Sequence, residues 1–218
     1  MLKFDAILFD CDGVLVDSEP ITIGVLRDLL EELGWTLTLQ ECMQHFVGKS
    51  IMDEVAIIRQ YTGHTVDRAW LASFQQQRDQ ELRLRLMPIP GALDAVRAIH
   101  AQWPGRIACA SGADRGKMEL QLNKVGLMPF FQGRTFSGHE TPRSKPFPDV
   151  YLAAAAALGV PAYACAVVED TVTGVTAGVA AGATVWGYAP DGQGDALLQA
   201  GASQVFTHMA DLPTMLMA

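Results

Sequence analysis

Short, uninterrupted apolar runs recur along the chain, and segments with a helical spacing of hydrophobic residues separate them. Runs without polar alternation are typical of strands in a parallel sheet that is covered on both faces. The spacing between the runs favours helices at 93–100, 116–125, 150–158 and 171–181. Strands that alternate with helices predict an α/β fold with an open parallel sheet. The expected strands are 6–9, 107–110, 135–136, 166–168, 184–188 and 205–206.

Residues 18–87 interrupt this alternation with helical patterns only. Because the insert follows the first strand directly, it is well placed to act as a lid, although it could also be an extra helical layer on one core. We expect a core domain of residues 1–17 and 88–218 and a helical cap domain of residues 18–87. The cap helices are expected at 21–33, from a capping box at Thr38 and Glu41, from Ser50 and Asp53 to Tyr61, and from Asp67 to Leu86.

Composition narrows the class of protein. Half of the 218 residues are hydrophobic, which suffices for one sizeable core and a small second module. The net charge of −8 and the absence of a basic, aromatic-rich stretch argue against nucleic-acid binding. No apolar run approaches membrane-spanning length, and the N-terminus enters the first strand without room for a signal peptide. We therefore expect a cytoplasmic protein.

The cysteines support that expectation. Cys11, Cys42, Cys109 and Cys165 show no CxxC spacing, and the last two lie within apolar strand-like runs. They are expected to be small core residues in a reducing compartment, and neither zinc ligands nor disulfide partners.

The candidate chemistry begins where the first strand should end. Asp10 and Asp12 follow the apolar run 6–9, and Gly13 lets the backbone turn away. Such a pair can hold a hard divalent cation and still provide a nucleophile and a proton shuttle. Two such aspartates without further polar partners would more simply form an acidic turn. The residues at the ends of the other strands therefore decide whether a catalytic site is indicated.

Those strand ends carry matching polar groups. Ser111 and Gly112 follow the second strand, Glu169 and Asp170 follow the fourth, and Lys145 precedes Pro146 between them. Ligands of open α/β sheets bind beyond the carboxyl ends of the strands, where these groups would gather. A hydroxyl, an ammonium and four carboxylates suit phosphoryl transfer through an aspartyl-phosphate, with Mg²⁺ offsetting the charge of the phosphate.

The motifs FDCDGVLVDSEP (9–20), KPFPD (145–149) and VEDTVTGVTAG (168–178), together with Ser111, resemble the four motifs of the haloacid dehalogenase superfamily. The resemblance covers essentially the whole chain. It is closest to the branch of phosphatases and β-phosphoglucomutase-like enzymes with a helical cap after the first motif. It implies a Rossmann-like core with an inserted all-helical cap.

The resemblance also implies roles for individual residues. Asp10 would be the nucleophile and a Mg²⁺ ligand, and Asp12 the general acid/base with its backbone carbonyl on the metal. Asp170 would complete the metal site, with Glu169 a direct or water-mediated ligand. Ser111, Gly112 and Lys145 would bind phosphate, with Lys145 also restraining Asp10. The cap residue Lys49 would reach the substrate, and Arg78 is a weaker candidate in the last cap helix.

Three other functions compete with that of a phosphatase. Dehalogenases of the superfamily lack the second carboxylate of the first motif, so Asp12 and the pair Glu169-Asp170 argue against dehalogenation. A phosphosugar mutase would typically carry a histidine a few residues after the first motif, and residues 18–22 contain none. A non-catalytic phosphate-binding regulator would usually show a damaged motif. The sequence therefore favours a Mg²⁺-dependent phosphatase acting on a small phosphorylated metabolite such as a sugar phosphate. The sequence identifies neither the substrate nor the oligomeric state.

Overall fold

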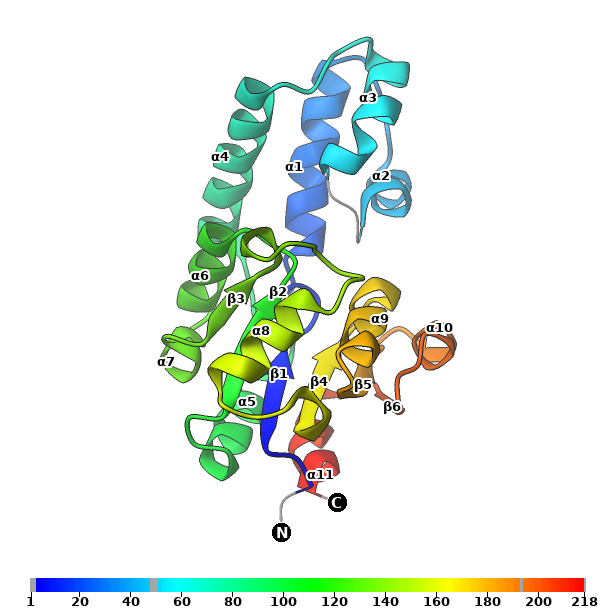
Figure 1. Ribbon diagram of the computed structural model, residues 1–218. Coiled ribbons are helices and arrows are strands. Elements are labelled where there is room, and N and C mark those ends of the chain that lie inside the picture. Colours follow the sequence, from blue (N-terminus) through cyan, green and yellow to red (C-terminus); the bar gives the residue numbers. More distant parts are fainter. Residues whose placement is uncertain (1–2, 48–50, 193, 218) are drawn as a thin grey trace. The chain divides into compact units, whose positions relative to one another are not determined.

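The computed structural model describes residues 3–47, 51–192 and 194–217 and divides into two compact units (Figure 1). One unit contains residues 1–17 and 87–218, and the other is Ser18–Leu86. Each unit has a hydrophobic core of its own.

The larger unit is built on one parallel sheet with the strand order β3-β2-β1-β4-β5-β6. Its strands are β1 (Ala6–Phe9), β2 (Ile107–Ser111), β3 (Thr135–Ser137), β4 (Cys165–Glu169), β5 (Thr184–Tyr188) and β6 (Gln204–Phe206). The predicted α/β class is thus confirmed. Because the chain runs outward from β1 to β3 and then crosses to β4, the sheet has a topological switch point between β1 and β4, where ligands of such sheets bind.

Helices cover both faces of this sheet. Ala6 and Leu8 pack with α8 (Asp149–Ala157) and α9 (Val172–Ala180), whereas Phe9 meets Phe131 on the opposite face in an edge-to-face contact. This two-sided burial explains why β1 is apolar at every position. The remaining helices of the unit are α5 (Ala92–Gln102), α6 (Arg115–Lys124), α7 (Met128–Phe131), α10 (Gly194–Gln199) and α11 (Leu212–Met217), with 3₁₀ turns at Gly138–Glu140, Ala162–Ala164 and Met209–Asp211.

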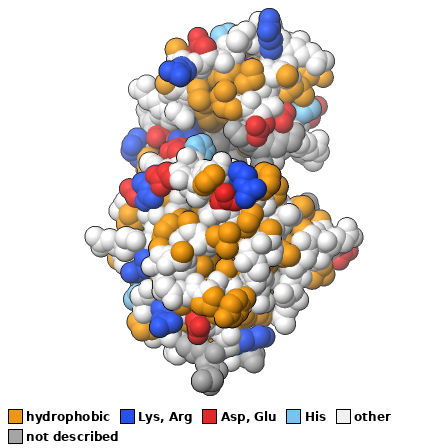
Figure 2. Space-filling model, viewed as in Figure 1, with side chains coloured by type: hydrophobic (Ala, Val, Ile, Leu, Met, Phe, Trp, Pro, Cys, Tyr) orange, Lys and Arg blue, Asp and Glu red, His pale blue; other side chains and the backbone are white. Residues whose placement is uncertain are grey.

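The outer face of α8 and α9 is unusually apolar. Figure 2 shows orange side chains gathered over the region that α8 covers in Figure 1. Leu152 of α8 and Val172 and Val179 of α9 are exposed. Small residues predominate in both helices, which lets their inner faces approach the sheet closely.

All the regular secondary structure in the described residues of the smaller unit is helical. It contains α1 (Glu19–Glu32), α2 (Leu39–Phe46), a 3₁₀ turn (Ile51–Glu54), α3 (Val55–Thr62) and α4 (Arg68–Arg85). The expected capping box at Thr38 and Glu41 is present, and Asp67 accepts a hydrogen bond from the Trp70 backbone N–H. The expected third helix begins as the 3₁₀ turn, which contains Asp53, and continues as α3 after Glu54, so its first turn is 3₁₀ and not α-helical. Ser50 lies outside the described residues.

The cysteines behave as the sequence predicts, since all four are buried free thiols. None of the described helices combines the length and the apolar character that crossing a bilayer requires.

The close packing of α9 on the sheet can be tested at Gly178. A Cβ there would lie 2.8 Å from Val185 Cγ2 and 3.2 Å from Val167 Cγ1, so neighbouring atoms would have to shift. We expect Gly178→Ala to lower the free energy of unfolding by about 1–3 kcal/mol, the usual cost of overpacking. Urea denaturation measures the change.

Gly24 of α1 provides the control, because a Cβ there meets no atom within 4 Å. Gly24→Ala should raise the free energy of unfolding of its own unit by about 0.5–1 kcal/mol through helix propensity. Equal stability of the wild type and the Gly178→Ala variant would contradict the packing argument.

Candidate active site

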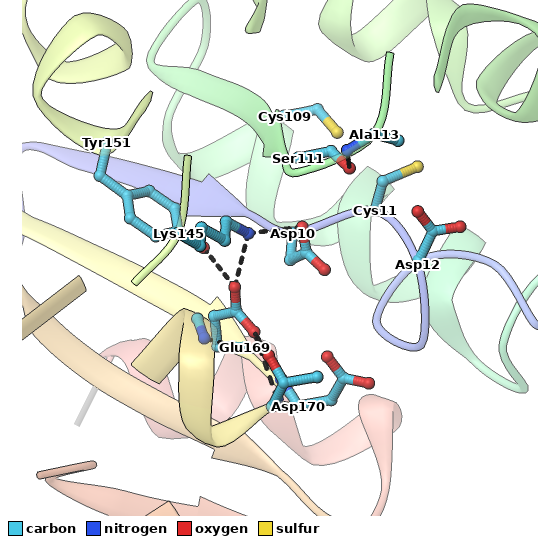
Figure 3. Close-up of polar contacts among 12 residues, drawn as sticks. Asp10, Cys11, Asp12, Cys109, Ser111, Ala113, Lys145, Tyr151, Glu169 and Asp170 are labelled. Carbon is cyan, nitrogen blue, oxygen red and sulfur yellow. Dashed lines mark hydrogen bonds and ion pairs between the residues drawn. The ribbon is translucent and has the colours of Figure 1, made fainter. Parts of the chain in front are cut away.

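The candidate site lies at the carboxyl edge of the central strands. Asp10 directly follows β1, and its backbone N–H donates to the Val168 carbonyl of β4 at 3.0 Å. Phe9 pairs with Cys109 of β2 and with Val168 of β4, so Asp10 is level with Ala110 and Glu169 at this edge, and Ser111 is the next and last residue of β2. The sheet register therefore brings Asp10, Ser111 and Glu169 together, as the sequence predicts (Figure 3).

Lys145 connects the carboxylates of Asp10 and Glu169 at this edge. Its Nζ donates to Asp10 Oδ1 at 2.7 Å and to Glu169 Oε1 at 2.6 Å, and only 9% of its side chain is exposed. Burial by itself would lower the pKa of the ammonium, but Asp10 and Glu169 raise that pKa well above its usual value. Lys145 is therefore a fixed positive charge between two buried carboxylates.

Glu169 is fully buried, and both of its oxygens accept several hydrogen bonds. Oε1 accepts from Lys145 and from the Tyr151 hydroxyl at 2.7 Å. Oε2 accepts from the backbone N–H of Asp170 at 3.1 Å and from the backbone N–H and hydroxyl of Thr171. These bonds fix the carboxylate and, through it, the position of the Lys145 ammonium.

A cluster of carboxylate oxygens suitable for a metal ion is formed by Asp10, Glu169 and Asp170. One oxygen of each lies within 4.8 Å of the others. Burial raises the pKa of the Asp10 carboxyl to about 7, with Glu169 and Asp12 adding to the rise and Lys145 opposing it. Concentrated negative charge on oxygen donors fits a hard divalent cation such as Mg²⁺.

Two glycines make room for this cluster. Gly13 has φ of 73°, and a Cβ there would lie 1.9 Å from Asp170 Oδ2. A Cβ at Gly174 would lie 1.8 Å from Glu169 Oε1. Gly174 thus leaves space for a site carboxylate, whereas Gly178 serves close packing between helix and sheet.

The Asp12 carboxylate belongs to a separate network on the far side of Asp10 from Lys145 (Figure 3). Its Oδ1 accepts hydrogen bonds from Lys117 Nζ and Gln121 Nε2 of α6, each at 2.8 Å. The side chain lies outside the Asp10–Glu169–Asp170 cluster. The expected metal contact of Asp12 through its backbone carbonyl stays a prediction.

Ser111 ends β2 and is buried. Its hydroxyl oxygen accepts a hydrogen bond from the Ala113 backbone N–H at 3.0 Å, which shapes the turn through Gly112. This turn leads directly into α6 and thus links the end of β2 to the helix that contacts Asp12.

Of the two cap candidates, Arg78 lies within the described residues. Lys49 lies outside the described residues. Arg78 is buried in α4 of the smaller unit, where its guanidinium pairs with Asp79 at 2.7 Å and lies over the Phe74 ring.

Sequence reasoning missed Tyr151, Thr171, Lys117 and Gln121. Tyr151 follows the KPFPD motif on α8, and Thr171 directly follows the pair Glu169-Asp170, so proximity to a motif was a usable signal for both. Lys117 and Gln121 carry no such signal, because polar residues four apart on a helix are usually solvated.

Residues 4–182 match the family of haloacid dehalogenase-like hydrolases, and the chain belongs to this family. The predicted resemblance is therefore confirmed, and the protein is a hydrolase by family. Over 218 residues the chain is 29% identical to the 6-phosphogluconate phosphatase of Escherichia coli K12, covering 98% of this chain and 95% of that protein. It is 30% identical over 211 residues to a probable pseudouridine-5'-phosphatase of Drosophila melanogaster, covering 94% and 89% of the two chains.

A solved structure gives the same result for the fold. The HAD family hydrolase of Deinococcus radiodurans R1, crystallised with bound phosphate and sodium, superposes with a TM-score of 0.80 at 34% identity. The alignment covers 99% of this chain and 96% of that one.

The hydrogen bond from the Tyr151 hydroxyl to Glu169 predicts a measurable contribution of Tyr151 to stability. Tyr151→Phe removes one donor to a buried carboxylate while keeping the ring, and we expect the free energy of unfolding to fall by about 1–2 kcal/mol. The exposed Tyr163 gives a matched control, since Tyr163→Phe should change stability by less than about 0.5 kcal/mol. Thermal or urea unfolding distinguishes the two. Equal effects of both changes would mean that the Glu169 contact contributes nothing to stability.

Proposed function

We propose that this protein is a Mg²⁺-dependent phosphatase that hydrolyses small phosphate monoesters, sugar phosphates among them, through an aspartyl-phosphate on Asp10. The observation that carries the proposal is the position of Asp10, a buried carboxylate held by Lys145 and clustered with Asp170 at the switch point of the sheet. The phosphatase names of two relatives that align along nearly the whole chain support the reaction class.

Asp10 is the proposed nucleophile. Lys145 binds Oδ1 and fixes the orientation of the carboxylate, so that an oxygen is aimed at an incoming phosphorus atom. Attack forms the bond between Asp10 and phosphorus as the bond to the ester oxygen breaks, and water then hydrolyses the acyl phosphate.

Asp10 and Asp170 are the proposed carboxylate ligands of Mg²⁺, together with the Asp12 backbone carbonyl. When bound, the ion offsets the repulsion between an anionic nucleophile and an anionic phosphate. Glu169 already accepts five hydrogen bonds through its two oxygens. This supports a water-mediated contribution of Glu169, which adds negative charge and aims Lys145, over direct ligation.

The remaining roles follow from charge and place. Asp12 is the proposed general acid/base, which protonates the departing ester oxygen and then accepts a proton from the attacking water. Ser111, the Gly112 backbone and Lys145 are proposed to bind the phosphate oxygens at the strand edge. Hydroxyl, N–H and ammonium donors complement the charge that phosphoryl transfer spreads over those oxygens.

The unit Ser18–Leu86 is proposed to be a cap that selects substrates, with Lys49 as its contact residue. For the substrate itself, 6-phosphogluconate is the first compound to test, because it names the relative that matches along the full length. Assay of the purified protein on a panel of phosphate monoesters, with and without Mg²⁺, tests the function. Interconversion of hexose phosphates without phosphate release would instead indicate a mutase, and turnover of nothing in the panel would refute the proposal.

Asp10→Asn should lower turnover at least about 10⁴-fold while leaving the fold intact, because the amide is nearly isosteric but a poor nucleophile. Rapid acid quench of the wild type with labelled substrate should trap phosphate on Asp10. Asp5 lies exposed before the other end of β1, so Asp5→Asn should be fully active. Reproducible labelling of Ser111 or of a histidine would rule out this nucleophile.

Asp170→Ala should raise the Mg²⁺ concentration needed for half-maximal activity at least about tenfold, because it removes a charged oxygen ligand. Titration of activity with Mg²⁺ measures the change. Asp195→Ala removes an exposed carboxylate of α10 and should leave the titration unchanged. Full wild-type activity in excess chelator would exclude a metal-dependent reaction.

A further inference from the structure

Two side chains of α6 converge on a single oxygen of Asp12. Lys117 and Gln121 are four residues apart and therefore lie on the same face of the helix. Lys117 Nζ and Gln121 Nε2 each donate to Asp12 Oδ1 at 2.8 Å. Two donors from different positions on one oxygen restrict both the rotation and the displacement of the carboxylate.

Both donors are buried, which is costly for such groups unless they are paired. Only 11% of the Lys117 side chain is exposed, and Gln121 is fully buried. Lysine is rarely buried without a partner, since its ammonium loses hydration. The Lys117 ammonium is thus placed against Asp12 at the expense of solvation.

Neighbouring groups also fix the orientation of the two side chains that contact Asp12. The Cys11 thiol donates to Gln121 Oε1 at 3.5 Å, so the amide of Gln121 turns its Nε2 toward Asp12. At the start of α6, Asp114 accepts a hydrogen bond from the Lys117 backbone N–H at 2.9 Å. A group held on a capped helix keeps its position better than one on a loop.

We propose that Lys117 and Gln121 are positioning residues that hold the Asp12 carboxylate where it transfers protons to and from the substrate. This inference rests on the proposed phosphatase function. Lys145 and Glu169 organise Asp10, and α6 independently organises Asp12. Loss of the α6 contacts lets Asp12 leave its working geometry, and misplacing a catalytic group by about 1 Å costs up to about 10²-fold in rate.

The first experiment compares kcat/KM for the best alkyl ester of the panel and for p-nitrophenyl phosphate. This quantity reports the steps up to departure of the leaving group, and an aryl oxide departs with less help from an acid. Lys117→Met should lower kcat/KM about 10- to 100-fold for the alkyl ester and clearly less for the aryl ester. Lys117→Arg, which keeps the charge, should recover most of the loss.

Lys124 is exposed near the end of the same helix and supplies the matched control. Lys124→Met should leave kcat/KM unchanged for both the alkyl ester and the aryl ester. If Lys117→Met does not fold, as judged by circular dichroism, Lys117→Gln retains a polar end and carries the same expectation. Equal losses on both esters, or none, would overturn the positioning role.

The second experiment combines Lys117→Met with Asp12→Asn. If Lys117 acts through Asp12, Lys117→Met should cause no further loss in the Asp12→Asn background. An additional loss of the same size would show that Lys117 acts elsewhere.

The two proposals fail differently. A wild-type protein without Mg²⁺-dependent phosphate release would overturn the phosphatase function and the positioning role with it. An active wild type whose Lys117→Met variant matches it on both esters would overturn the positioning role alone.

Discussion

The site depends on one interaction, the buried ammonium of Lys145 between Asp10 and Glu169. Two carboxylates at the ends of adjacent strands would otherwise repel each other in surroundings of low polarity. One cation offsets that repulsion and at the same time fixes the distance between the carboxylates. The arrangement requires β1 and β4 to be neighbours in a parallel sheet, which the strand order provides at its switch point. The buried site therefore needs this topology as much as it needs these residues.

The second constraint is the room available for the site carboxylates, and it explains two glycines that take no part in the chemistry. Gly13 and Gly174 both lie where a methyl group would occupy the position of a site carboxylate. Because the chain at Gly13 also adopts a positive φ, other residues would be strained there even if room existed. The Asp170 carboxylate is thus confined by the backbone at Gly13, and the Glu169 carboxylate lies between the backbone at Gly174 and its hydrogen-bond donors, which leaves Glu169 few alternative conformations.

The sequence predicted the features that depend on local pattern. Apolar runs located the strands, and the polar groups at their ends located Asp10, Ser111, Glu169 and Asp170, since parallel strands bring their carboxyl ends together. It did not predict the short helices α7, α10 and α11, which span too few residues to show a helical period. Tyr151, Lys117 and Gln121 were also missed. Their roles depend on which helix face meets the strand edge. For Lys117 and Gln121 this is decided by packing between segments more than 100 residues apart.

The two aspartates of the first motif are contacted by different parts of the fold. Asp10 is bound by Lys145, which lies between β3 and α8, whereas Asp12 is bound by α6, which follows β2. A shared set of partners would couple their positions, because moving one carboxylate would disturb the donors of the other. The described hydrogen-bond partners of the two carboxylates differ, so the contacts that orient Asp12 can change while Lys145 still holds Asp10. In the proposed reaction, in which Asp10 attacks phosphorus and Asp12 moves protons, a change in α6 would alter the orientation of Asp12 while the Lys145 contact to Asp10 remains.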